Sequence, residues 1–148
     1  MRLLLQRAQR AHVEVAGEVV GEIGSGLVVF VGVFPDDNRL IVDRLVERML
    51  GLRIFADDDK PMNRSVADVG GGVLLVSQFT LAADTSRGRR PGFSTAAAPA
   101  VAQELYDYLV ETTRAAHPDV ATGEFGADMQ VHLVNDGPVT FLLENPAP

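Results

Sequence analysis

The amino-acid sequence predicts a single α+β domain that spans residues 1–148 and contains two main helices. Three observations support this prediction. A chain of 148 residues with 47% hydrophobic content is large enough to bury a core in one compact domain without disulfides or metals. Two segments place apolar residues at helical spacing. Runs of apolar and β-branched residues between glycines have the length of strands.

The first part of the chain is predicted to form strands. Residues 3–15 mix apolar and polar positions and include β-branched side chains. Residues 27–34 are a continuous apolar run, which indicates a buried strand. Four glycines are expected to mark turns between these short strands: Gly17, Gly21, Gly24 and Gly26.

The first helix is predicted over residues 40–52, where apolar residues recur every three or four positions with charged residues between them. Asp36 or Asp37, just before it, offers an N-cap. After a polar loop, glycines 70–72 form a turn that leads into a strand over residues 73–77. That strand ends at Ser77.

The second helix follows a long irregular connection over residues 82–94. Ser94 or Thr95 is the expected N-cap, Pro99 suits the first turn, and the helix stops before His117-Pro118. The predicted buried stripe of this helix is Val101, Leu105, Tyr108, Leu109 and Thr112. Two strands, residues 129–134 and 139–143, close the chain with Asn135-Asp136-Gly137-Pro138 as a turn between them.

The composition excludes several classes of chemistry. The chain has no cysteine, which removes thiol nucleophiles and cysteine-based metal sites and is compatible with a reducing cytosol. A net charge of −7 argues against a general nucleic-acid binder, although a local basic patch still suits one RNA end. Since no segment has the length of a signal-peptide core or a membrane span, we expect a cytoplasmic protein.

Two polar segments are candidates for the functional site, and each also has a purely structural interpretation. Ser77, Gln78 and Thr80 place two hydroxyls and an amide at the end of an apolar strand, where they face a ligand or satisfy local backbone groups. Gly137-Pro138 is compatible with an ordinary turn, and the local sequence alone favours a trans peptide bond. The local pattern leaves both interpretations open.

Charged and titratable residues add one further candidate. Arg87, Arg89 and Arg90 cluster in the long connection and form either a phosphate-binding feature or a solvated loop. The three histidines, His12, His117 and His132, are scattered along the chain without metal-ligand spacing. We therefore expect structural or surface roles for them and no metal site.

Taken together, Ser77-Gln78-Phe79-Thr80-Leu81 and Asn135-Asp136-Gly137-Pro138-Val139-Thr140 resemble the two signature motifs of the D-aminoacyl-tRNA deacylases, also called D-tyrosyl-tRNA deacylases. The order and separation of the motifs fit, and the similarity extends along the chain, for example at Arg53-Ile54-Phe55 and Ala127-Asp128-Met129. The resemblance implies a homodimer of a compact α+β fold with barrel-like antiparallel or mixed sheets, and no cofactor.

The same resemblance implies hydrolysis of the ester that joins a D-amino acid, or mischarged glycine, to the terminal adenosine of tRNA. It makes Ser77, Gln78, Phe79 and Thr80 the catalytic segment. It also implies that Gly137-Pro138, with a cis peptide bond, enters the active site of the partner to bind the substrate and select its chirality. Arg87, Arg89 and Arg90 become candidate tRNA contacts.

Ester hydrolysis mainly requires a site that holds the carbonyl, stabilises its oxyanion and delivers water. We expect the Ser77 hydroxyl and the backbone N–H groups near Phe79 and Thr80 to face that oxyanion, while Gln78 fixes the shape of the segment. Thr80 is a candidate nucleophile, and the 2′-hydroxyl of the substrate offers the alternative route. Two non-enzymatic alternatives also stand: an RNA-end or nucleotide-binding module, and an interaction domain.

Overall fold

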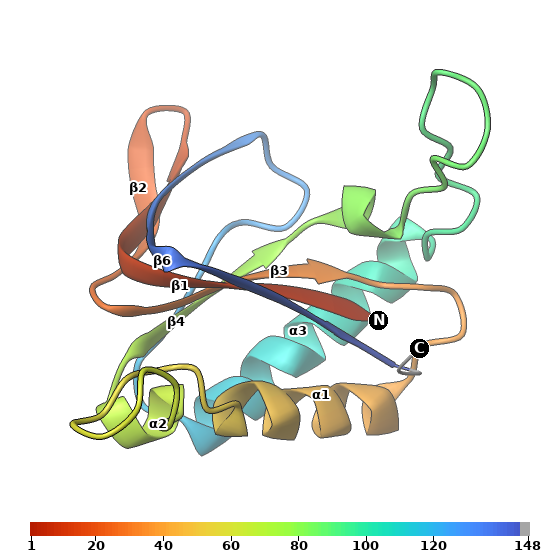
Figure 1. Ribbon diagram of the computed structural model, residues 1–148. Helices are drawn as coiled ribbons and strands as arrows, with labels where there is room; N and C mark the ends of the chain where they lie inside the picture. Colours follow the sequence, from red (N-terminus) through yellow and green to blue (C-terminus); the bar gives the residue numbers. More distant parts are fainter. Residues whose placement is uncertain (146–148) are drawn as a thin grey trace.

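The computed structural model describes residues 1–145. Its six strands form a mixed sheet that curls into a nearly closed barrel (Figure 1). Strand β1 (Arg2–Val15) pairs antiparallel with β3 (Gly26–Gly32) through its first half and with β2 (Glu18–Ile23) through its second half. Strands β4 (Gly72–Ser77) and β5 (Val120–Thr122) extend the sheet in parallel. The predicted α+β class with barrel-like mixed sheets is confirmed.

The barrel approaches closure where β2 meets β5. A Cβ atom at Gly21, within β2, would lie 2.1 Å from the carbonyl oxygen of Thr122 in β5. Glycine is therefore required here for the two backbones to approach each other. The prediction that Gly21 marks a turn is wrong, whereas Gly17 does lie in the turn between β1 and β2, with a φ of 82°.

Two main helices, α1 (Arg39–Gly51) and α3 (Pro99–Ala116), lie along one face of the sheet, and the short helix α2 (Val66–Val69) precedes β4 (Figure 1). Successive residues of β4 alternate between two cores. Leu75 packs in the core under the helices, and Leu74 packs in the core inside the barrel. Because both faces of this strand are buried, its sequence is apolar at nearly every position.

Both helices lie close to their predicted positions, but their caps differ. Asn38 caps α1 by accepting a hydrogen bond from the N–H of Ile41 at 3.0 Å. The predicted cap, Asp36 or Asp37, is wrong, because the carboxylate of Asp37 accepts from the N–H of Phe34 at 2.7 Å instead. No helix within residues 1–145 is long and apolar enough to cross a membrane.

Helix α3 begins with Pro99 in its first turn and ends before His117-Pro118, as predicted. Its N-cap is Ala98 and not Ser94 or Thr95, since the Thr95 hydroxyl donates to the carbonyl of Ala82 at 2.6 Å. The predicted buried stripe is correct at Leu105 and Leu109 and wrong at Val101, which is exposed. The buried residues of α3 are Ala102, Leu105, Tyr106, Leu109, Val110 and Thr113.

The C-terminal strands that were predicted separately form one strand, β6 (Met129–Glu144), which pairs antiparallel with β1. The expected turn at Asn135-Asp136-Gly137-Pro138 is instead a bulge within this strand. Residues 136–139 lie opposite Arg7 alone, since Asn135 pairs with Ala8 and Thr140 pairs with Gln6. A bulge of this kind bends the strand and turns the extra residues out of the ladder.

Candidate active site

Ser77 is the last residue of β4, and the chain changes direction directly after it. The N–H of Gln78 donates to the carbonyl of Val31 in β3 at 2.8 Å, which extends the sheet by one residue. The chain then enters a short 3-10 helix, η1 (Phe79–Ala82). Ser77 and Gln78 are half-buried, while Phe79 and Thr80 are exposed. The segment is thus held by the sheet on one side and by a helical turn on the other.

A cavity of about 600 Å³ lies at this end of β4. Its lining is largely apolar and comes from the ends of β3 and β4, the start of α3 and the turn before β6. Among the described residues that line it, Asp128 is the only charged one. Ser77, Gln78 and Phe79 line the cavity, whereas Thr80 does not. Three of the four predicted catalytic residues therefore share one cavity.

Small residues just before α3 and in its first turn form one wall of this cavity. Ala96, Ala97, Ala98, Pro99 and Ala102 all line it. Side chains of this size leave space beside Ser77 that larger residues would occupy. The motifs gave no indication of this contribution, and the alanine-rich composition of residues 96–102 was the only available sequence signal.

An aromatic pair stands beside the cavity. The ring of Phe79, 59% exposed, lies with its centroid 5.1 Å from that of Phe93, at an angle of 54°. Both residues line the cavity. Exposed aromatic rings in this position suit the stacking of a nucleobase.

The side chains of Gln78 and Thr80 form a hydrogen bond across the start of η1. The side-chain amide of Gln78 donates to the Thr80 hydroxyl at 2.5 Å. This contact fits the predicted role of Gln78 in fixing the shape of the segment. The first N–H groups of a helix have no acceptor within it, so the N–H groups of Phe79 and Thr80 are available to a ligand.

The three arginines lie on an exposed loop between η1 and Phe93, a residue of the cavity lining. Asp84 and Gly92 exchange two backbone hydrogen bonds of 2.8 Å and so close a loop that carries Arg87, Arg89 and Arg90. The carboxylate of Asp84 accepts from the hydroxyl and the N–H of Ser86, and these bonds lower the pKa of Asp84. Asp84 therefore stays ionised at neutral pH and orders the base of a basic loop.

The second candidate segment is the bulge of β6, where Gly137 and Pro138 are exposed and joined by a cis peptide bond. The side-chain amide of Asn135 donates to the carbonyls of Arg7 and Val139, both at 2.9 Å. Arg7 in turn donates from Nε to the carbonyl of Asp136 at 3.1 Å. Side chains on both strands thus fix the backbone that presents Gly137 and Pro138.

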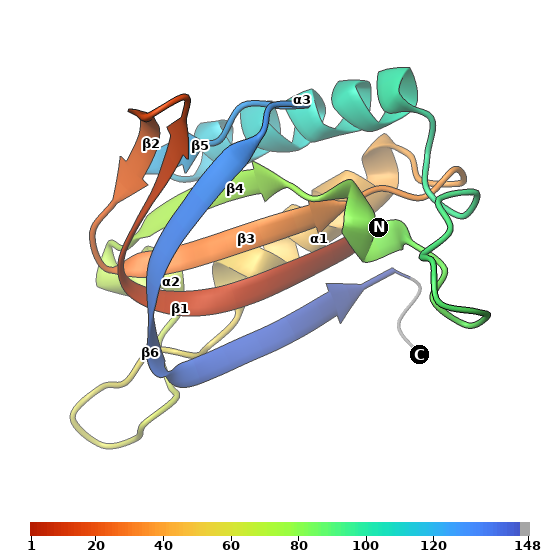
Figure 2. The same cartoon turned by 90° about the horizontal axis from the view of Figure 1, so that it is seen from above.

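One chain alone does not bring the two segments together. Ser77 is in register with Val31, which pairs with Leu3, whereas the bulge lies opposite Arg7. Strand spacings place the bulge roughly 13 Å farther along β1 and three strands across from Ser77. Figure 2 shows the bend of β6 and the short helix η1 at opposite ends of the sheet. Gly137 and Pro138 are not among the residues that line the cavity at Ser77.

Comparison with known proteins gives consistent matches along the chain. Residues 4–144 match the family model described as D-Tyr-tRNA(Tyr) deacylase. A D-aminoacyl-tRNA deacylase of Pseudomonas putida strain F1 is 62% identical over 144 residues, which are 97% of this chain and 99% of the relative. The family model and this relative both cover nearly the whole chain.

Solved structures share the fold. The structure of the c-Myc DNA unwinding element binding protein superposes with a TM-score of 0.94 at 38% identity, covering 99% of this chain and 100% of the other. A structure described as a probable eukaryotic D-amino acid tRNA deacylase gives a TM-score of 0.83 at 21% identity, covering 96% and 97% of the two chains. The second match demonstrates a common fold.

Proposed function

This chain belongs to the D-Tyr-tRNA(Tyr) deacylase family and is a hydrolase, and on that basis we propose that it cleaves the ester bond of D-aminoacyl-tRNA. The resemblance that the two motifs predicted is confirmed. The proposed products are a free D-amino acid and a tRNA that is available for recharging. Since charged tRNA is made and used in the cytoplasm, the enzyme is proposed to act there.

The placement of Ser77 at the rim of an apolar cavity is the structural observation that best supports this reaction. The cavity has the volume of a site for a small molecule or the end of a larger one. Hydroxyl and N–H donors next to an apolar space stabilise negative charge more strongly than they do in bulk water. In the proposed complex, the Ser77 hydroxyl and the N–H groups of Phe79 and Thr80 donate to the oxyanion.

The proposed reaction adds water to the ester carbonyl. Attack forms a tetrahedral oxyanion, and its collapse breaks the bond between the carbonyl carbon and the ribose oxygen. One proton of the attacking water goes to that oxygen, so that tRNA leaves with a free hydroxyl. The other proton goes to solvent, and the amino acid leaves as a carboxylate. Asp128 is the charged residue of the cavity lining and is exposed, and its negative charge attracts the ammonium group of the substrate.

Activation of the water is proposed to come from the 2′-hydroxyl of the terminal adenosine rather than from Thr80. Thr80 lies outside the cavity lining, and its hydroxyl accepts a hydrogen bond from Gln78. A threonine hydroxyl without a base is a weak nucleophile near neutral pH. The substrate hydroxyl lies next to the ester and needs no protein base to be in position.

The enzyme is further proposed to act as a homodimer whose active site combines two chains. The separation of Ser77 from Gly137-Pro138 within one chain supports this arrangement, because a second copy can place its bulge at the cavity. The carbonyls of the partner's Gly137 and Pro138 are then free to accept the amino group of a D-amino acid and to crowd an L side chain. Glycine, which has no side chain, is expected to be hydrolysed as well.

Subunit complementation tests the shared site directly. Ser77→Ala and Gly137→Ala each impair one half of the proposed site, so a heterodimer of the two variants contains one intact site and one doubly altered site. Random mixing of chains in a two-fold dimer is expected to restore about one quarter of wild-type activity. Failure to restore activity, with heterodimers verified by mass spectrometry, would show that Ser77 and Gly137 of different chains do not share a site.

The activity itself is tested by multiple-turnover deacylation of D-tyrosyl-, L-tyrosyl- and glycyl-tRNA by the wild-type chain. We expect turnover of the D and glycyl substrates and little turnover of the L substrate. Each tenfold preference corresponds to about 1.4 kcal/mol between the two transition states. Stoichiometric tRNA binding without turnover would favour an RNA-end-binding module instead.

Nucleic-acid binding without catalysis is the second candidate, and the basic loop is the observation that favours it. Arg87, Arg89 and Arg90 are exposed on the loop that directly precedes Phe93, a residue of the cavity lining. The 38% identical solved structure is named for binding a DNA unwinding element. The net charge of −7 opposes general binding to nucleic acid, because that affinity depends on neutralising phosphates. The loop therefore fits better as a contact for the end of the substrate tRNA.

A further inference from the structure

Two histidines that are far apart in the sequence lie side by side on the sheet. The antiparallel register of β1 and β6 pairs His12 with His132. Their rings stack with centroids 4.3 Å apart and an angle of 9° between the planes. The spacing of these histidines in the sequence did not indicate this contact, because strand pairing brings them together.

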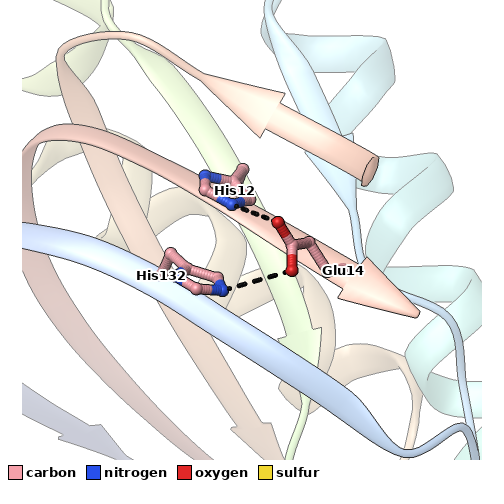
Figure 3. Close-up of side chains that lie close together, drawn as sticks. All are labelled: His12, Glu14 and His132. Atoms are coloured by element: carbon pink, nitrogen blue, oxygen red, sulfur yellow. Dashed lines mark hydrogen bonds and ion pairs between the residues drawn. The ribbon is translucent and has the colours of Figure 1, made fainter. Parts of the chain in front are cut away.

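A carboxylate completes the group. Figure 3 shows the side chains of both histidines pointing toward Glu14. The Nε2 atom of His12 is 3.1 Å from one carboxylate oxygen of Glu14, and the Nε2 atom of His132 is 3.5 Å from the other. The three groups offer ligand atoms that all lie within 4.8 Å of one another. We call His12, Glu14 and His132 the strand triad.

The spacing of the strand triad matches the geometry of a bound metal ion. Zinc binds histidine nitrogen and carboxylate oxygen at about 2.0–2.2 Å, so neighbouring ligand atoms of a tetrahedral site are roughly 3.4 Å apart. Two of the separations within the triad, 3.1 and 3.5 Å, are close to that value, and all three lie within 4.8 Å. An ion can be bound after small side-chain rotations, because all three residues are already on paired strands.

The donor set and its surroundings favour a divalent cation. Two imidazoles and one carboxylate are ligands that zinc accepts, with the fourth position left for water. His12 and His132 line a cleft together with Glu22 and Asp119, whose negative charges attract a cation, and with Arg10, whose charge opposes it. Glu14 and both histidines are partly or fully exposed, so an ion reaches them without opening the core.

We propose that the strand triad is a Zn²⁺ site, with Nε2 of His12, Nε2 of His132 and the carboxylate of Glu14 as ligands. The ion links the N-terminal strand β1 to the C-terminal strand β6, at a point of β6 that precedes its bulge in the chain. The triad lies several residues farther along β1 than Arg7, on the side away from Leu3 and the Ser77 end of the sheet. The site is thus separate from the proposed active site, and it does not depend on the proposed function.

The test is a zinc titration of the untagged full-length chain after removal of metals with EDTA. Isothermal titration calorimetry with ZnCl₂ is expected to give saturable binding of one ion per chain. We expect at least about tenfold weaker zinc affinity in each of three variants, His12→Ala, His132→Ala and Glu14→Gln. Mutation of a residue that only hydrogen-bonds to a metal ligand already costs about this much affinity. CoCl₂ is expected to give the visible absorption of a tetrahedral site in the wild type and not in these variants.

Glu18→Gln is the matched control, since Glu18 is an exposed carboxylate on the neighbouring strand β2 outside the triad. It is expected to bind zinc as the wild type does. The buried His117, whose Nε2 lies 2.6 Å from the carbonyl of Gly71, is unchanged in every variant. Far-ultraviolet circular dichroism verifies that each variant is folded. Absence of zinc binding by the wild type, or equal affinity in His132→Ala, would overturn the proposal.

Discussion

Arg7 holds the carbonyl oxygen of Asp136 through its Nε at 3.1 Å, and the same guanidinium donates from Nη1 to the carbonyl of Ile54 at 2.7 Å. The side chain is 14% exposed, so the two bonds are largely shielded from water. One residue of β1 thus joins the bulge of β6 to the segment after α1. The position of Gly137-Pro138 depends on this arginine and on Asn135.

Arg7→Ala is expected to reduce kcat/KM for D-tyrosyl-tRNA by about 10²-fold, because a small misplacement of the bulge misorients the substrate. Arg7→Lys is expected to recover little of that activity, since a lysine lacks the planar fork that donates in two directions. Single-turnover deacylation measures the effect. Arg10→Ala, an exposed arginine on the same strand, is the control and is expected to retain activity. A fully active Arg7→Ala would show that the bulge needs no anchor.

Gly137→Ala is expected to impair turnover of D-tyrosyl-tRNA. Gly137 has a φ of 136°, and a Cβ there would lie 2.6 Å from Cγ2 and 3.0 Å from the backbone nitrogen of Val139. The bulge must shift to relieve these contacts. Gly24→Ala, where a Cβ meets nothing within 4 Å, is the matched control and is expected to behave as the wild type. Wild-type kinetics in Gly137→Ala would count against a substrate-facing role for the bulge.

Ser77→Ala is expected to lower kcat by about 10²–10³-fold, the usual effect of removing one oxyanion donor. KM is expected to change much less, since the hydroxyl stabilises the transition state more than the bound ester. Steady-state kinetics with D-tyrosyl-tRNA separates the two constants. An effect on KM alone would assign Ser77 to substrate binding.

Thr80→Val removes the hydroxyl and approximately preserves the shape of the side chain. Turnover is expected to fall at most about tenfold, because Thr80 lies outside the cavity lining and only the hydrogen bond from Gln78 is lost. The complementary measurement uses tRNA ending in 2′-deoxyadenosine, for which the wild-type enzyme is expected to lose most of its activity. A kcat reduced about 10³-fold or more in Thr80→Val would support a nucleophilic threonine.

Replacing Arg87, Arg89 and Arg90 together by alanine is expected to raise KM for D-tyrosyl-tRNA and to leave kcat nearly unchanged. All three residues are exposed, and they are proposed to neutralise phosphates at the end of the tRNA. The slope of log KM against log salt is expected to become shallower by about 0.7 for each phosphate of the single-stranded tRNA end that the variant no longer neutralises. An unchanged salt dependence would remove the loop from the tRNA interface.

The elements of the fold were largely predictable from local patterns. The helix over 39–51 and the end of the second helix before His117-Pro118 follow from apolar spacing and from the restriction that proline places on its neighbour. The prediction of the first cap was wrong because two aspartates and Asn38 are equally good candidates by residue type. Which of them caps the helix depends on Phe34, whose N–H binds Asp37.

In the C-terminal strand β6, too, some features follow from the local sequence and others only from pairing with a distant strand. Its two halves were predicted as strands, but the four polar and turn-forming residues between them indicated a turn. Pairing of both halves with β1 makes that stretch a bulge. A turn and a bulge share residue preferences, and only the partner strand distinguishes them.

The sequence by itself determined the α+β class, the two helices and, through its motifs, the family, and it singled out the two segments that are proposed to form the active site. Tertiary structure decided that Ala96–Ala98 form a wall at Ser77, that Arg7 anchors the bulge, that Ser77 and Gly137 lie apart within one chain, and that His12 meets His132. Local spacing encodes which side chains share a face of one helix or strand. Contacts between residues distant in the chain depend on strand register, which follows from how the complete set of apolar faces packs together.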